Sequence, residues 1–213
     1  MWIRADLKDK AKINFRKNYW MCVVAALILG LVITISTSSS SGAAGIVSIA
    51  LLLLGVFVFN VIQVGGCRFF IENAYENPRL NKLLFAFESG NYGNMVLTMF
   101  LMQLYTVLWS LLLMIPGIIK TYEYRMIPYL LADCPDMPRK EAFKISKEMM
   151  YGNKMAAFIL DMSFIGWVLA AAFTCGLVGI FWTAPYQYAT NAELFLALKE
   201  EYFSNRNIEQ VEA

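Results

Sequence analysis

The sequence predicts an all-α membrane protein, a polytopic helical bundle that crosses the bilayer about six times. Three observations predict this class. The chain of 213 residues is 59% hydrophobic, with a mean hydropathy of +0.53. Only 16% of its residues are charged, whereas a soluble domain usually carries about a quarter. Apolar runs long enough to cross about 30 Å of hydrocarbon recur along the chain, which favours a single membrane domain over residues 1–213.

The apolar runs divide the chain into six expected spans. The polar turn "SSSSG" separates the first two, and the turn signal Pro116-Gly117 is expected to close the third. A glycine break in "FTCGLVG" precedes the last span, which is more polar than the others. The six runs are Trp20–Thr37, Ala43–Gly65, Asn94–Ile115, Ile118–Ala132, Met155–Ala172 and Ile180–Leu198.

Three stretches between the spans are amphipathic. Apolar residues recur at three- and four-residue spacing in Arg4–Tyr19, Arg79–Tyr92 and Pro138–Tyr151, which predicts helices with one apolar face. Basic helices of this kind often lie in the membrane interface. There they could bind anionic lipid or a partner, or simply cover the cytoplasmic face. The candidate lipid contacts are Lys8, Lys12, Arg16, Arg139, Lys140, Lys144 and Lys147.

Short sequence matches predict a threefold repeat. "YGN" precedes a span at Tyr92 and again at Tyr151, and "RFFIENAYENP" resembles "RMIPYLLADCP". The repeated unit would be an amphipathic helix followed by a hairpin of two spans. The matches are short, so chance and shared interface chemistry are an alternative explanation. The units would cover about 1–78, 79–135 and 136–203, and 204–213 would form a flexible tail.

The basic residues predict the orientation. With six spans, the amphipathic stretches and both termini share one side, and the turns "STSSSSGAA", "PG" and "TCG" on the other side carry no Lys or Arg. The positive-inside rule then places both termini in the cytoplasm. Sixteen of the eighteen basic residues fall on this side: Arg4, Lys8, Lys10, Lys12, Arg16, Lys17, Arg68, Arg79, Lys82, Arg139, Lys140, Lys144, Lys147, Lys154, Lys199 and Arg206.

The residue types present argue against catalysis. The chain has no histidine, the commonest general base and metal ligand, and its four cysteines lack any C-x-x-C spacing. No G-x-S-x-G or H-E-x-x-H motif occurs. We therefore expect no enzyme activity, no metal and no cofactor. Nucleic acid is not an expected partner, because the basic residues alternate with acidic ones and face a membrane.

A charged cluster in the fourth expected span is the candidate functional site. The apolar stretch "IPGIIKTYEYRMIPYLLAD" carries Lys120, Glu123 and Arg125, and Asp161 lies in the fifth span. Lys120 and Glu123 can meet on one helix face, and Arg125 can pair with Asp161 if the two spans are neighbours. Pro128 frees a backbone carbonyl beside these charges. The cluster is either a structural salt bridge or a polar pocket for an ion or a headgroup.

The chain resembles a known family in "MWIRADLKDKAK…NYW", "IPGIIKTYEYRMIPYLLADCPDM…EAFKISKEMMYGNK" and "FIGW…WTAPY". These motifs are similar to the integral membrane family called domain of unknown function 975. The resemblance implies a multi-span protein of the bacterial cytoplasmic membrane and no particular activity. A weaker likeness, in "IPGI…Y…A…KIS…GN", is to the membrane domain of some glycerophosphodiester phosphodiesterases, whose catalytic domain is absent here.

Two functions remain open after the sequence analysis. The first is a non-catalytic membrane module that binds lipid or a protein partner and serves envelope maintenance. The second is a small solute or ion transporter or channel that uses the intramembrane charges. Parallel repeats favour the module, because transporters often contain inverted repeats.

Overall fold

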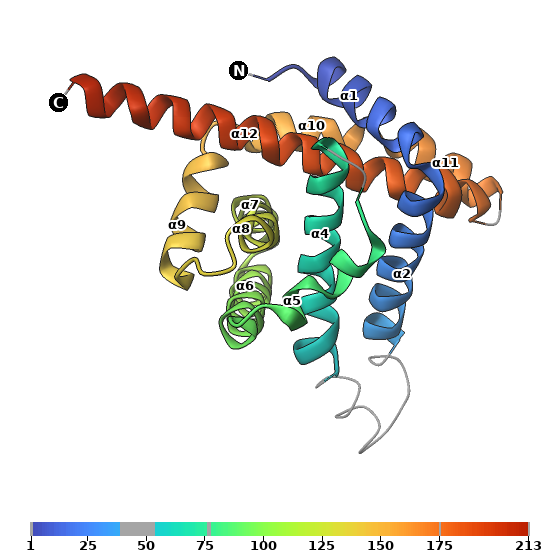
Figure 1. Cartoon of the computed structure of the whole chain (residues 1–213), viewed down its shortest axis with the longest axis horizontal. Coiled ribbons are helices and arrows are strands. Elements are labelled where there is room, and N and C mark those ends of the chain that lie inside the picture. The colour runs from blue at the N-terminus through green and yellow to red at the C-terminus, as the bar shows by residue number, and fades with distance from the viewer. Residues whose placement is uncertain (1, 39–53, 76–77, 175, 213) are drawn as a thin grey trace.

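The computed structural model describes residues 2–38, 54–75, 78–174 and 176–212, and these are helical with no strand. The all-α prediction is confirmed. Figure 1 shows the arrangement of the helices. Their bounds are α1 Arg4–Lys17, α2 Tyr19–Ser38, α4 Asn60–Tyr75, α5 Phe85–Glu88, α6 Tyr92–Leu112, α7 Met114–Glu123, α8 Ile127–Asp133, α9 Arg139–Met149, α10 Lys154–Met162, α11 Ile165–Phe173 and α12 Ala184–Glu212.

Three shorter helical segments complete the described chain. Gly55–Phe59 and Gly179–Thr183 are π-helices that lead directly into α4 and α12, and Leu80–Leu84 is a 3-10 helix that leads into α5. The predicted turn after Ser38 and the first part of the second expected span, residues 43–53, lie outside the described residues. α12 continues to Glu212, through the stretch expected to be a flexible tail.

The helices form three pairs that run in different directions (Figure 1). α2 packs beside α4, α6 packs against α7 in a tight hairpin, and α11 turns back through a π-helix into α12. The turn after α11 contains Gly176, whose φ of +86° suits only glycine at low cost, as the predicted glycine break requires. α12 packs on α1 and α4, so the first and last thirds of the chain are in contact.

Helix length and composition support two or three membrane spans. Tyr92–Leu112 and Lys154–Phe173 are long and apolar enough to cross a bilayer. α1 and α2 would add a third if they count as one span, although they meet at a bend of 102°. Among the described residues, the six expected spans are therefore not confirmed, since α4, α7 and α8 are too short or too polar to qualify.

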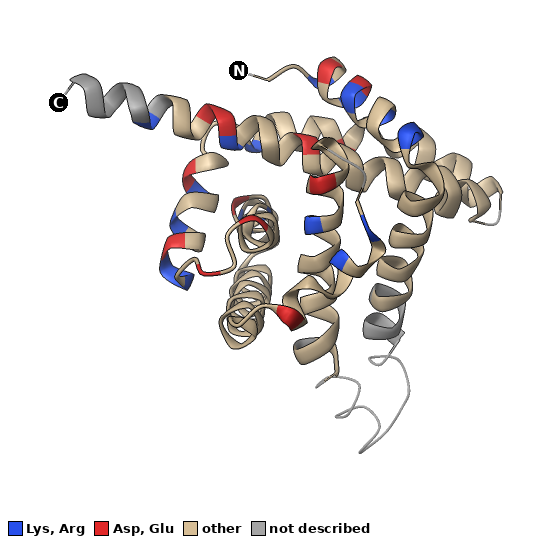
Figure 2. Cartoon of the chain, viewed as in Figure 1, with Lys and Arg blue, Asp and Glu red and all other residues tan. Residues whose placement is uncertain are grey.

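Much of the surface is apolar, as expected for a protein embedded in lipid. Leu111 and Phe173, at the ends of α6 and α11, are 87% and 89% exposed. Soluble monomers rarely expose large contiguous apolar patches. Figure 2 shows many of the charged residues on α1, α9 and α12, with others on α4, α5, α7 and α8, whereas α6 and α11 carry none. The charged side chains are thus concentrated away from α6 and α11.

The fourth expected span is broken in the middle. The chain turns after α6 at Leu113, whose backbone is extended, three residues before the predicted turn at Pro116-Gly117. The following helix, α7, ends at Glu123, and a turn over 124–126 leads into α8, where Pro128 lies in the first turn. Proline lacks an N–H and is favoured at such positions. Ile118–Ala132 is therefore two short helices and not one span.

The expected amphipathic helices cover the protein and do not place their apolar faces in lipid. The apolar face of α1 is buried, mainly against α12, and that of α9 is buried beside α8 and α12. The basic residues opposite these faces are mostly exposed. Arg79–Tyr92 is helical only over Leu80–Glu88, as a 3-10 helix followed by the single-turn α5, so the helix is shorter than predicted. Of the three expected helices, α1 and α9 form as regular α-helices close to the predicted length.

A glycine marks the same place in each of the three helix pairs. Gly55, Gly117 and Gly179 are spaced 62 residues apart, and two of them begin π-helices. Gly117 lies against α6, where an added Cβ would come within 2.4 Å of the Ser110 hydroxyl oxygen. This 62-residue spacing differs from the spacing of the short motifs that predicted three repeated units. The repeat of those units stays a prediction. It places Cys67, Tyr129 and Asn191 at equivalent positions, also 62 residues apart.

A charged cluster beside a central cavity

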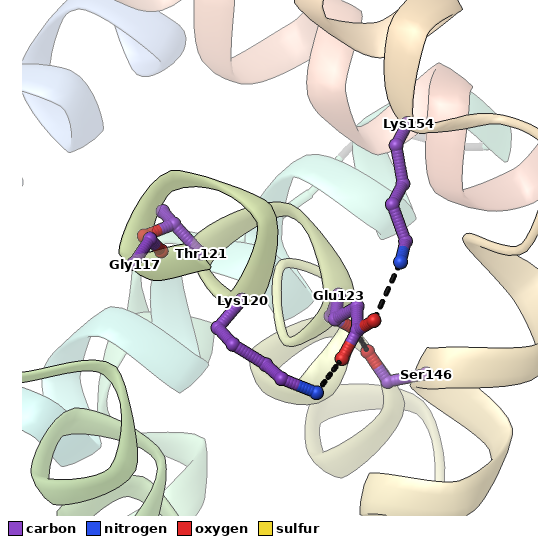
Figure 3. Close-up of polar contacts among 6 residues, drawn as sticks. All are labelled: Gly117, Lys120, Thr121, Glu123, Ser146 and Lys154. Atoms are coloured by element: carbon purple, nitrogen blue, oxygen red, sulfur yellow. Dashed lines mark hydrogen bonds and ion pairs between the residues drawn. The ribbon is translucent and has the colours of Figure 1, made fainter. Parts of the chain in front are cut away.

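Glu123, at the end of α7, is held between two lysines (Figure 3). The Glu123 carboxylate lies 2.5 Å from the Lys120 ammonium, one turn back on α7, and 2.5 Å from the Lys154 ammonium at the start of α10. Glu123 is only 5% exposed. A buried carboxylate needs a cation, and the cluster supplies two.

The backbone around Glu123 is also satisfied. The last carbonyls of a helix have no partner within it. At the end of α7 the Ser146 hydroxyl, from α9, donates to the Glu123 carbonyl at 2.7 Å (Figure 3). Lys120 lies in the last turn, where a cation also interacts favourably with the helix dipole. The break between α7 and α8 is thus stabilised by side chains from two other helices.

Arg125, in the turn between α7 and α8, forms a second ion pair. Its guanidinium donates to both carboxylate oxygens of Asp161 on α10, at 2.6 and 2.8 Å. The same group donates to the Asn191 side-chain oxygen on α12 at 2.7 Å. The Tyr122 hydroxyl donates to Asp161 at 2.9 Å. This bidentate geometry is the strong form of an Arg–carboxylate pair.

The two ion pairs join the same helices in register. Lys154 and Asp161 are seven residues apart, which places them on one face of α10. Glu123, at the end of α7, faces Lys154, and Arg125, in the following turn, faces Asp161. Opposite charges therefore meet at both positions. Three cations and two carboxylates make up the cluster, so it carries a net charge of +1 when all five groups are ionised.

A cavity of about 450 Å³ lies next to this cluster. Its walls come from α2, α4, α6, α7, α8, α12 and the α7–α8 turn, and include the three equivalent residues Cys67, Tyr129 and Asn191. The volume is within the range of about 300–1,000 Å³ that ligand sites have. Arg125 supplies the one charged side chain among the described lining residues. The cavity therefore extends from Arg125, which belongs to the charged cluster, to residues of α2, α4, α6 and α12.

The cavity reaches the surface where three of its lining residues are exposed: Gln103, Val107 and Thr121. Val107 belongs to its lining and is 62% exposed. The neighbouring Leu104 and Leu108 on α6 are exposed as well. α6 is one of the helices that could cross the membrane. The opening of the cavity thus has both polar and apolar side chains at its edge, and it lies beside a possible membrane span.

Sequence reasoning found four residues of this cluster and missed three. Lys120, Glu123, Arg125 and Asp161 come together in the two predicted pairs. Lys154 was assigned to the cytoplasmic surface, although its spacing from Asp161 places both on one helix face. Asn191 and Ser146 carried no local signal, because only the tertiary packing of α9 and α12 brings them to the cluster.

The basic residues proposed as lipid contacts do not gather into one site. Lys12, Arg16, Arg139, Lys140, Lys144 and Lys147 are exposed, on α1 or α9. Lys8 is half-buried, and its ammonium lies 4.6 Å from the centre of the Phe164 ring. None of these residues lines the central cavity.

Residues 111–202 match the model of a family described as "Protein of unknown function (DUF975)". The match covers the central and C-terminal motifs on which the resemblance rested, together with the charged cluster. No curated protein and no solved structure matches the chain. The resemblance to the DUF975 family is confirmed over the matched residues, and the weaker likeness to the phosphodiesterase membrane domain is not shown.

Proposed function

We propose that this chain, whose residues 111–202 match the DUF975 family, is a non-catalytic membrane module that binds a membrane lipid in its central cavity. The module is proposed to lie in the bacterial cytoplasmic membrane with both termini in the cytoplasm. A role in envelope maintenance, with an additional protein partner, is part of the same proposal. Nucleic acid has no place in it.

The position of the cavity mouth carries the proposal. The cavity opens beside Val107 and Gln103 on α6, a helix that could cross the membrane, so a molecule dissolved in the bilayer could reach it from the side. Its lining is mixed, with Leu29, Phe70 and Met102 on one hand and Gln63 and Thr106 on the other. A mixed lining suits a molecule with a hydrocarbon chain and a polar group.

The charged cluster supports a binding role better than a catalytic one. Glu123 and Asp161 are each held by a cation, so neither is free to act as a general base. The cluster joins α7, α9, α10 and α12 and fixes the shape of one cavity wall. In this proposal the ion pairs are structural, and Arg125 also faces the ligand.

Blocking the cavity mouth tests the proposal. A tryptophan at Val107 (V107W) adds bulk at the opening, and we expect it to reduce lipid binding by the purified protein at least about tenfold. The measurement is titration with phospholipid, followed by native mass spectrometry. V168W is the matched control, because Val168 on α11 is similarly exposed at 55% and does not line the cavity. Equal binding by wild type, V107W and V168W would contradict the proposal.

A small transporter or channel is the second candidate, and the net positive charge beside the cavity favours it. A passage for anions would use Arg125 as a stepping site. Against this, Arg125 is closely paired with Asp161, which reduces its attraction for a passing anion. A flux assay in liposomes separates the two functions. Anion or solute flux that V107W abolishes would favour transport over lipid binding.

A further inference from the structure

We infer that the central cavity holds its lipid by the glycerol ester carbonyls, which accept hydrogen bonds from uncharged donors in the lining. This inference rests on the proposed function and names the part of the lipid that the cavity recognises. It follows from three features of the lining: a charge that is already balanced, amide and hydroxyl donors that have no partner, and an apolar wall in the same cavity.

The lining carries no charge that requires a counter-ion from a ligand. Arg125 is the one charged side chain among the described lining residues, and it donates to both carboxylate oxygens of Asp161, at 2.6 and 2.8 Å. The other charged residues of the cluster, Lys120, Glu123 and Lys154, do not line the cavity. A phosphate or an ammonium group inside the cavity would therefore be a charge without a partner in a mainly apolar surrounding, which is costly. The lining suits a polar group that is neutral.

The Asn191 side chain on α12 is oriented by Arg125. A guanidinium has only donors, so Asn191 must turn its side-chain oxygen to Arg125, and the two groups lie 2.7 Å apart. The Asn191 amide nitrogen then keeps two N–H groups, which have no hydrogen-bond partner in the described part of the chain. The ion pair of Arg125 with Asp161 thus holds Asn191 in place and leaves its donors for a ligand.

Two further lining residues have donors without a partner. Neither the Gln63 amide on α4 nor the Tyr188 hydroxyl on α12 is hydrogen-bonded to another described residue. The Thr106 and Thr121 hydroxyls, by contrast, donate to carbonyls of their own helices. Amide and hydroxyl donors without a partner are unfavourable away from water. An oxygen atom that only accepts would satisfy them, and the ester carbonyls of a lipid supply two such atoms.

The same cavity has an apolar wall for the rest of the lipid. Leu29, Phe70 and Met102 line it together with Gln63 and Asn191. In a glycerolipid the ester carbonyls lie where the headgroup joins the acyl chains. A lipid whose carbonyls accept from Gln63 and Asn191 can therefore place the first part of an acyl chain against the apolar wall. Its headgroup needs no charged partner in the lining.

A comparison of two lipids tests the inference. Phosphatidylcholine with ester-linked chains and its ether-linked analogue, with the same headgroup and chain length, are titrated into the purified full-length protein and counted by native mass spectrometry. The ether lipid lacks both carbonyl oxygens and keeps the phosphate. Each hydrogen bond contributes a few-fold to affinity, so we expect the ester lipid to bind about tenfold more tightly. V107W should weaken the binding of both lipids.

Variants then locate the preference for the ester lipid. Q63M removes the amide and keeps the length of the side chain, whereas N191D keeps an oxygen for Arg125 and removes the amide donors. We expect each to reduce the preference by at least about threefold. Q187M is the matched control, because Gln187 on α12 is also half-buried and does not line the cavity. If N191D does not fold, the comparison of Q63M with Q187M still decides the question.

The outcomes separate the inference from the proposed function. Equal affinity for the ester and ether lipids, each reduced by V107W, would overturn the recognition of the carbonyls and leave the lipid-binding module in place. Binding of neither lipid would overturn both. A preference for the ester lipid that Q63M and N191D leave unchanged would assign it to other groups and overturn the inference. A preference that Q187M reduces as much as Q63M does would overturn it as well.

Discussion

Glu123 shows how a single residue can depend on two partners. Because Lys120 and Lys154 both lie 2.5 Å from its carboxylate, either one can hold the charge if the other is lost. We expect K120Q and K154Q each to lower the free energy of unfolding by less than about 1.5 kcal/mol. The double variant leaves a buried carboxylate alone and should cost about 3–5 kcal/mol.

Chemical unfolding in detergent, followed by circular dichroism, measures this difference. K147Q is the control, because Lys147 is exposed on α9 and should contribute almost nothing. Losses in the double variant that equal the sum of the two single losses would show that the lysines act independently and would contradict this account.

Arg125 and Asp161 form a pair in which each residue is the other's main counter-charge. R125Q and D161N each leave a charge without its partner, and we expect each to cost about 3–5 kcal/mol of the free energy of unfolding. R125Q/D161N removes both charges and should cost less than either single change. A thermodynamic cycle measured in the same detergent checks this prediction. Additive losses would mean that the pair contributes no coupling energy.

At the scale of elements, the two ion pairs fix how α10 lies against the end of α7. Glu123 meets Lys154 and Arg125 meets Asp161, so opposite charges face each other at both positions. If α10 ran the other way past this segment, Glu123 would face Asp161 and Arg125 would face Lys154. Both contacts would then be repulsive. The alternating charges therefore exclude the reversed packing.

Gly65 allows the closest approach between two elements. A Cβ at this position on α4 would lie 2.0 Å from the backbone oxygen of Leu83, so the Leu80–Leu84 segment would have to move. We expect G65A to cost about 1–3 kcal/mol of the free energy of unfolding, as overpacking usually does. G93A on α6 is the matched control, because nothing lies within 4 Å of a Cβ there. A G65A protein as stable as G93A would contradict this close packing.

At the scale of the whole molecule, the concentration of charged side chains away from α6 and α11 predicts the topology. Cys134 is exposed in the connection between α8 and α9, on the proposed cytoplasmic side, whereas Cys22 and Cys67 are buried. In a C175S background, a membrane-impermeant maleimide should label Cys134 in inside-out vesicles and not in intact cells. A cysteine at Ser39, with Cys134 replaced by serine, should give the opposite result. Labelling of both sites from one side would exclude the proposed topology.

The labelling of Cys134 should also depend on pH. Partial shielding from water, and then the negative charge of Asp133, raise the pKa of the Cys134 thiol. Since the thiolate is the reactive form, a raised pKa means less thiolate at neutral pH. We expect labelling slower than that of free cysteine at pH 7, and a rate that keeps rising above pH 9. A rate that levels off below the ordinary thiol pKa of about 8.5 would contradict this expectation.

The sequence by itself determined the class of the protein and the main charged contacts. Apolar composition and helical periodicity are properties of local segments, so they predicted an all-α membrane protein and the faces of α1 and α9. The pairs Lys120–Glu123 and Arg125–Asp161 followed from the rule that a charge inside an apolar segment needs a partner nearby.

Only the tertiary structure decided which surfaces the helices pack against and which distant residues come together. It turned the apolar faces of α1 and α9 onto protein, because α12 and α8 offered surface that the sequence does not reveal. In the folded protein α7 ends at Glu123, because the Ser146 hydroxyl of α9 donates a hydrogen bond to the Glu123 carbonyl, which has no partner within the helix. The tertiary structure also brought Cys67, Tyr129 and Asn191 around one cavity, since residues 62 apart meet only when three helix pairs pack together.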